Sequence, residues 1–236
     1  MENTYSYVAD NVKRVQNEIT EACIKYGRDP KEVILMGVSK TQPIEKLEVA
    51  YNAGITLFGE NRVQELVQKA DFFAQYNVPC HIIGTLQTNK VKYLPPLTDT
   101  IQSVNSLKLA NEIEKQYGKA GKKANICLEI NIGDEDSKSG IPYSQTMELI
   151  HQLSEYKNLT VKGLMCIPPI DDTEGVRKYF GQMHKLFVDI SSKKLDNIDM
   201  CILSMGMSGD YPWAIAEGST LVRVGTGIFG QRNYNL

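Results

Sequence analysis

The sequence lacks any marked excess of charge: its 236 residues include 26 lysines and arginines against 28 aspartates and glutamates. So small a net charge gives no electrostatic field that would attract nucleic acid or an anionic membrane surface. No apolar run approaches the length of a membrane-spanning helix. Met1–Asp10 also has neither the basic nor the apolar segment of a secretory signal. We therefore expect a cytoplasmic protein that binds neither nucleic acid nor membranes.

Cysteine and histidine are scarce as well, and their spacing argues against two kinds of cross-link. The five cysteines are odd in number, widely spaced and without a Cys-x-x-Cys pair, so they do not suggest a disulfide framework. The three histidines, His81, His151 and His184, show no ligand spacing with them. A structural zinc site typically takes its four ligands as closely spaced pairs. We therefore predict no metal site.

Short apolar runs alternate with helical patterns along the chain. Eight runs read as strands: Val33–Lys40, Ile55–Phe58, Cys80–Ile83, Thr100–Val104, Asn125–Ile132, Val161–Ile167, Asp199–Leu203 and Leu221–Val224. Before them, Tyr7–Tyr26 has apolar residues at steps of three and four, which is typical of one helix face. The pattern favours an α/β fold, a single (β/α)8 TIM-type barrel over residues 1–236 with an extra N-terminal helix. An open doubly wound sheet is the alternative. No long amphipathic stripe is left over, so we expect a monomer.

The first of these runs ends in a lysine. Val33–Lys40 is bounded by Pro30 and Pro43, and its mostly apolar residues suit a fully buried parallel strand. Lys40 would then lie at the carboxyl end of the strand, where ligands bind in both α/β barrels and open sheets. The alternative interpretation is a lysine whose ammonium group simply reaches water.

Two glycine-rich segments follow the last two predicted strands. Ser204–Asp210 contains Gly206 and two serines, Ser204 and Ser208, and Arg223–Gly227 contains Gly225 and Thr226. Glycines let backbone N–H groups approach a phosphate, and hydroxyl groups can donate to its oxygens. The loops after strands seven and eight are the usual phosphate position in a barrel. With Lys40 at the same rim, we predict Schiff-base chemistry on a phosphorylated carbonyl, either pyridoxal phosphate or a sugar phosphate.

The motifs that contain these residues resemble a known family. They are Gly37-Val-Ser-Lys40-Thr, Phe58-Gly-Glu-Asn61, His81-x-Ile-Gly84-x-Leu-Gln87-x-Asn-Lys90, Gly163-Leu-Met165-x-Ile-Pro, Ser204-Met-Gly-Met-Ser208-x-Asp210 and Val222-Arg-Val-Gly225-Thr-Gly-Ile-Phe-Gly230. In this order they resemble the pyridoxal phosphate homeostasis protein family, which is similar to the barrel domain of alanine racemase. The resemblance covers nearly the whole chain.

This resemblance implies pyridoxal 5'-phosphate as the cofactor and Lys40 as the lysine of its aldimine. It also implies Ser204, Gly225 and Thr226 as phosphate ligands, and Arg223 as a contact of the pyridine nitrogen or the phosphate. Asn61 would face the ring substituents. The chain departs from many relatives at two positions, with Gln42 in place of a lysine and Arg62 in place of a tyrosine. Gln42 puts in doubt any role for a second lysine beside Lys40.

Three functions fit these residues. The resemblance favours a carrier or regulator in intracellular pyridoxal phosphate homeostasis, without strong catalytic activity, that passes the cofactor to apoenzymes. The alternatives are a pyridoxal phosphate-dependent amino-acid racemase and a Schiff-base aldolase acting on a sugar phosphate. A racemase needs a second base, which alanine racemase takes from a domain beyond its barrel, and this sequence shows no such domain before Leu236. We therefore expect no catalytic residue.

Three other residues could act as a second base or amine. Glu60 and His81 lie near the predicted rim, and Lys138 lies in the polar segment Gly133–Gly140. We interpret each of them as an ordinary charged or hydrogen-bonded residue. Lys138 has one further possibility, because a second amine near the mouth could take the aldehyde from Lys40 and assist its release.

Overall fold

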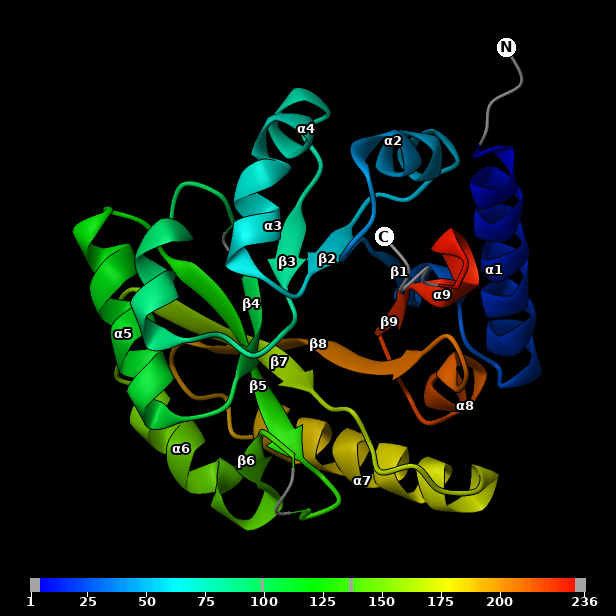
Figure 1. Ribbon diagram of the computed structural model, residues 1–236. Helices are drawn as coiled ribbons and strands as arrows, with labels where there is room; N and C mark the ends of the chain where they lie inside the picture. The colour runs from blue at the N-terminus through cyan, green and yellow to red at the C-terminus, as the bar shows by residue number, and fades with distance from the viewer. Residues whose placement is uncertain (1–4, 99, 136–137, 232–236) are drawn as a thin grey trace.

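Parallel strands close into a barrel in the computed structural model, which describes residues 5–98, 100–135 and 138–231 (Figure 1). The eight barrel strands are β1 (Ile34–Val38), β2 (Phe58–Glu60), β3 (Cys80–Ile82), β4 (Thr100–Val104), β5 (Ala124–Asn131), β7 (Leu159–Met165), β8 (Ile198–Met207) and β9 (Leu221–Val224). Each pairs with its neighbours in this order, and β9 returns to pair with β1. The predicted (β/α)8 barrel is confirmed, and the alternative of an open sheet is wrong.

Helices surround this barrel, and each has buried residues on one face (Figure 1). They are α1 (Ser6–Lys25), α2 (Ile44–Asn52), α3 (Val63–Gln68), α4 (Ala70–Gln75), α5 (Leu107–Lys119), α6 (Thr146–Leu153), α7 (Thr173–Ser191), α8 (Tyr211–Ala216) and α9 (Thr226–Phe229), with 3-10 turns at Pro30–Glu32, Thr88–Tyr93 and Tyr143–Gln145. Among the described residues, no helix is long and apolar enough to cross a membrane.

The extra N-terminal helix is confirmed, and its position follows from its sequence pattern. Val8, Val12, Val15 and Ile19 of α1 recur at helical spacing and are all buried. This face packs against α2, α8 and α9, so α1 lies on the outside of the barrel beside its last helix (Figure 1). The first and last parts of the chain are thereby joined.

Most strand boundaries differ from the prediction by one or two residues, and the start of β2 and the end of β8 differ by more. The second strand begins at Phe58 rather than Ile55, because its ladder to β3 starts where the Phe58 N–H donates to the Pro79 carbonyl, 3.0 Å away. The seventh predicted strand does not end at Leu203. It continues as β8 to Met207, so Ser204 lies inside the ladder, opposite Met165 and Leu221. The short strand β6 (Ile141–Pro142), which pairs with β5, was not expected from the sequence.

The described residues cover most of the predicted domain. Residues 1–4 and 232–236, at the ends of the predicted range 1–236, lie outside them. So do residues 136–137 of the polar segment that carries Lys138. A single domain over the whole chain therefore stays a prediction.

Candidate functional site

A cavity of about 260 Å³ opens at the carboxyl ends of the strands. Its lining residues are Val38, Lys40, Asn61, Ile83, Ile167, Met207, Ser208, Gly209, Arg223, Gly225 and Thr226. Most of the predicted site residues therefore line this one cavity. Ser204 and Gly206 are the two predicted site residues that do not line it.

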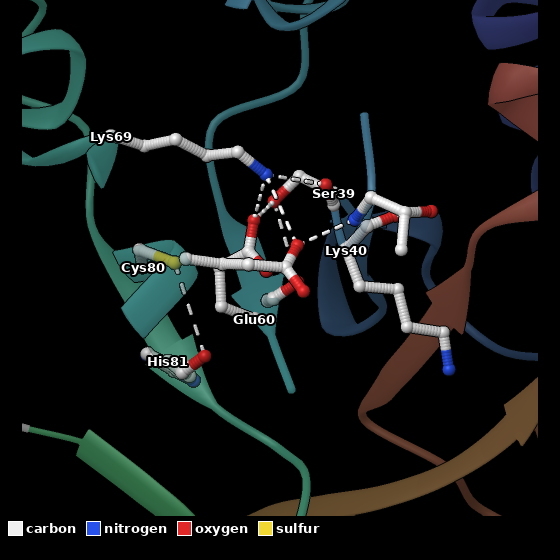
Figure 2. Close-up of polar contacts among 9 residues, drawn as sticks. Ser39, Lys40, Glu60, Lys69, Cys80 and His81 are labelled. Atoms are coloured by element: carbon white, nitrogen blue, oxygen red, sulfur yellow. Dashed lines mark hydrogen bonds and ion pairs between the residues drawn. The ribbon is translucent and has the colours of Figure 1, made fainter. Parts of the chain in front are cut away.

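Lys40 reaches this cavity from the end of β1. The strand stops at Val38, and the fully buried Ser39 separates it from the lysine. Ser39 is held by its N–H, which donates to the Gly59 carbonyl 3.0 Å away. Figure 2 shows the Lys40 side chain pointing away from the cluster formed by Glu60 and Lys69. The prediction that β1 delivers a lysine to the rim agrees with this geometry.

The hydroxyl groups on the other side of the cavity come from two loops that are joined to each other. Ser208 follows β8, and Thr226 follows β9 as the first residue of α9. The Gly227 N–H donates to Ser208 Oγ at 3.2 Å, which ties the two loops together. The Ser208 hydroxyl hydrogen is still available to a ligand, because that oxygen acts here as an acceptor.

The extra helix α1 fixes the position of α9. Its Arg14 guanidinium donates to the Gly227 carbonyl at 2.9 Å, and its Asn11 amide donates to the Ile228 carbonyl at 3.0 Å. Its Tyr7 hydroxyl donates to the Phe229 carbonyl at 3.1 Å. The carbonyl groups at the end of a helix have no partners within the helix. Here α1 supplies those partners, so it holds in place the helix that presents Thr226.

Ser204 lies deeper in the barrel than its sequence suggested. It is fully buried, its Oγ donates to Gln102 Oε1 at 2.7 Å, and it accepts from Arg223 at 2.7 Å. A second donor of Arg223 reaches the Cys166 carbonyl at 2.8 Å. The sequence predicts a serine in a loop after the strand, but the longer β8 turns its hydroxyl towards Arg223.

Arg223 belongs to a chain of hydrogen bonds that crosses the barrel interior. Gln102 accepts from Ser204 through its oxygen, so its amide nitrogen donates to His81 Nδ1 at 2.9 Å. Burial lowers the pKa of Arg223, and nearby polar groups oppose that effect. An arginine remains charged even so. The network therefore holds a permanent cation at the cavity wall.

Gly206 has a structural reason to be glycine. Its φ is +92°, a conformation that side chains rarely adopt, and a Cβ there would lie 2.6 Å from the Ala214 Cβ. The register of β8 against β9 also shifts between Ser204 and Met207. Gly206 thus allows β8 to bulge against α8 and carries Ser208 to the cavity. Its contact with a ligand stays a prediction.

The three candidate bases do not line the cavity. Glu60 is fully buried, and its pKa is raised by burial, although an ion pair with Lys69 opposes the shift. His81 is held in the interior network. Lys138 is paired with Glu135 at 2.6 Å and donates to the Pro168 carbonyl at 3.1 Å, so it lies beside the loop after β7.

Sequence reasoning missed Lys69, Glu65 and Gln102. Lys69 and Glu65 are four residues apart, a spacing that usually marks an exposed pair on a helix. Lys69 is instead buried, because it sits where α3 ends and α4 begins. Gln102 lies in β4, whose sequence is otherwise typical of a barrel strand. A buried amide in a strand is the one signal that could have pointed to an interior network.

The comparisons with known proteins agree with one another. The family model described as alanine racemase, N-terminal domain, matches residues 9–233. The pyridoxal phosphate homeostasis protein of Pasteurella multocida is 42% identical over 231 residues, which are 97% of this chain and 99% of the relative. The protein of the same name from Escherichia coli is 38% identical over 233 residues, with 97% and 98% covered.

Solved structures give the same relationship. An unknown protein from Bifidobacterium adolescentis superposes with a TM-score of 0.92 at 34% identity and covers 97% of both chains. PipY of Synechococcus elongatus, whose structure has PLP bound, superposes with a TM-score of 0.78 at 32% identity, over 90% of this chain and all of PipY. Alanine racemase of Clostridium difficile has a TM-score of 0.71 at 16% identity, which shows the fold alone.

We expect His81→Gln to make the protein less sensitive to acid. Burial lowers the pKa of His81 from 6.5 to about 4, so the unfolded chain takes up this proton first as the pH falls. Stability that is present above pH 6.5 is then lost towards pH 4. Because of His81, the free energy of unfolding should fall by about 1–2 kcal/mol between pH 7 and pH 5.

Urea unfolding at both pH values measures this effect. The exposed His151 of α6 supplies the control, since His151→Gln should lose as much stability as the parent. An equal loss in His81→Gln would show that the His81 ring does not titrate in this way.

Proposed function

Because the chain belongs to the pyridoxal phosphate homeostasis proteins, within the alanine racemase N-terminal domain family, we propose that it carries pyridoxal phosphate and regulates its supply in the cytoplasm. PLP is bound in the structure of PipY, a relative 32% identical to this chain. Pyridoxal phosphate is the cofactor of this chain too. Its transfer to apoenzymes by a monomeric carrier is part of the proposal.

One observation carries this proposal: a lysine, an arginine and two hydroxyl residues line one cavity. Lys40, Arg223, Ser208 and Thr226 match the parts of a phosphorylated aldehyde with a pyridine ring. The amine suits the aldehyde, the hydroxyls suit the phosphate, and the guanidinium suits the ring nitrogen. The donor set therefore fits the cofactor. Asn61 and Gly225 complete the proposed site, and Ser204 acts on the cofactor through Arg223.

The cofactor supplies an aldehyde and, when its ring is protonated, a strong electron sink. In the proposed site, Lys40 would hold the cofactor through a bond from Nζ to the aldehyde carbon, which would release one water molecule. Arg223 already donates to Ser204 and Cys166 and cannot give up its proton. A fixed cation at the ring nitrogen would disfavour protonation there. This environment supports tight holding of the cofactor rather than strong catalysis.

Two alternatives have less support. A racemase-like activity is favoured by the match to the alanine racemase domain. Racemisation needs a base on each face of the substrate carbon, and the described residues around the cavity offer Lys40 without a carboxylate, tyrosine or histidine. An aldolase acting on a sugar phosphate is disfavoured by the names of the relatives.

We expect Lys40→Ala to abolish the visible absorption band of the loaded protein. The band depends on the covalent bond to Nζ, which alanine cannot form. In the parent, borohydride reduction followed by peptide mapping should find the label on the Lys40 peptide. Lys90→Ala serves as the control and should keep the band. A label on Lys138 or Lys90 in the parent would mean that the attachment site has been wrongly assigned.

Thr226→Val should weaken binding of pyridoxal phosphate but not of pyridoxal, which has no phosphate. The variant loses one hydrogen bond to a charged group, worth roughly 1.5–3 kcal/mol, or about ten- to a hundredfold in affinity. Ser204→Ala is the comparison, and it should weaken both ligands alike because Ser204 acts through Arg223. Titration calorimetry gives the affinities of the parent and of both variants for the two ligands. Equal losses in Thr226→Val would place the phosphate elsewhere.

The carrier function itself is tested by proton exchange. The loaded protein is incubated with each common amino acid in deuterated water while NMR follows the α-proton, and cofactor transfer to an apoenzyme is measured in parallel. We expect no exchange at an enzyme-like rate, together with transfer of the cofactor to the apoenzyme. Exchange on the order of 1 s⁻¹ or faster would overturn the carrier proposal in favour of a racemase-like enzyme.

A further inference from the structure

Two charged side chains from outside the barrel hold the backbone on both sides of Lys40. Lys69 Nζ donates to the Ser39 carbonyl at 2.8 Å. Glu65 Oε2 accepts the Thr41 N–H at 2.6 Å. Glu65 and Lys69 are themselves 3.6 Å apart. The residue before Lys40 and the residue after it are therefore both fixed by one ion pair, which comes from α3 and its junction with α4. Figure 2 shows the Lys69 side chain reaching Ser39 and Glu60.

A third residue anchors this pair in the barrel wall. Glu60 of β2 accepts from Lys69 at 2.6 Å and from the Ser39 hydroxyl at 2.7 Å, both through Oε1. Its other oxygen is buried without a hydrogen-bond partner in the described part of the chain. Glu60 and Lys69 are 0% and 6% exposed. Burying an ion pair costs several kcal/mol per ion, so stability alone is a poor reason for it.

The backbone next to Lys40 shows what the pair restrains. Thr41 has a φ of +61°, in the left-handed region that β-branched residues strongly disfavour. The chain thus turns sharply directly after Lys40. The hydrogen bond from the Thr41 N–H to Glu65 stabilises this turn, and the bond from Lys69 fixes the carbonyl before it.

We propose that Glu65 and Lys69, anchored by Glu60, form a clamp that sets the direction in which the Lys40 side chain enters the cavity. This inference rests on the proposed function, in which Lys40 bonds to the cofactor aldehyde. The three clamp residues are positioning residues, since they act on Lys40 through its neighbours. Their removal should slow attachment at Lys40 and leave the rest of the cofactor site intact.

Pyridoxine phosphate separates attachment at Lys40 from binding by the rest of the site, because it carries the phosphate and the ring but no aldehyde. In Lys69→Met, attachment of pyridoxal phosphate, followed as growth of the absorption band, should be about ten- to a hundredfold slower. The affinity for pyridoxine phosphate should not change. Lys115→Met provides the matched control, because Lys115 is exposed and pairs with a glutamate on the far helix α5.

A second variant covers the case in which Lys69→Met fails to fold because it leaves Glu60 buried and unpaired. Glu60→Gln/Lys69→Met removes both charges, so it should regain stability while attachment at Lys40 stays slow. Normal attachment in a folded variant, or an equal loss of pyridoxine phosphate affinity, would overturn the clamp. If reduction of the parent fails to label Lys40, the proposed function fails instead, and the two failures are distinguishable.

Discussion

The hydrogen-bond ladder between β1 and β9 is the constraint on which the rest of the site depends. It closes the barrel and pairs Met36 of β1 with Arg223 of β9. Lys40 at the end of β1 and Thr226 after β9 thereby face one cavity. In an open sheet these strands would lie at separate edges. The helix α1 strengthens the same closure, since it comes before β1 in the chain and supplies the hydrogen bonds that hold α9.

Buried polar groups give this barrel its fixed geometry. One network crosses the interior from His81 to Arg223, and the other runs from Glu60 through Lys69 to the backbone around Lys40. Each buried polar group costs desolvation energy that its hydrogen bonds must offset. The first network ends on Arg223, which lines the cavity, and the second ends on Ser39 and Thr41, the two neighbours of the cavity residue Lys40. The desolvation energy is therefore concentrated in the groups that set the directions of the Lys40 amine and the Arg223 guanidinium.

The sequence was sufficient to predict the barrel and most of the cavity lining, because strand periodicity reports burial and barrel topology brings strand ends together. It was insufficient for Ser204, since small residues such as Gly206 suggest a turn where β8 in fact continues through a bulge. Lys69 was missed for a different reason. Its spacing from Glu65 is that of a surface pair, and its burial depends on a helix junction and on Glu60, which no local pattern reveals.

The most direct test of the central claim is a crystal structure of the protein loaded with pyridoxal phosphate. The site predicts continuous density between Nζ of Lys40 and the cofactor, with the phosphate at Ser208 and Thr226 and the ring nitrogen facing Arg223. The direction of the Lys40 side chain should match that of the protein without cofactor, because its backbone is held on both sides. Density for the cofactor on Lys138 or Lys90, with the cavity beside Lys40 empty, would contradict it.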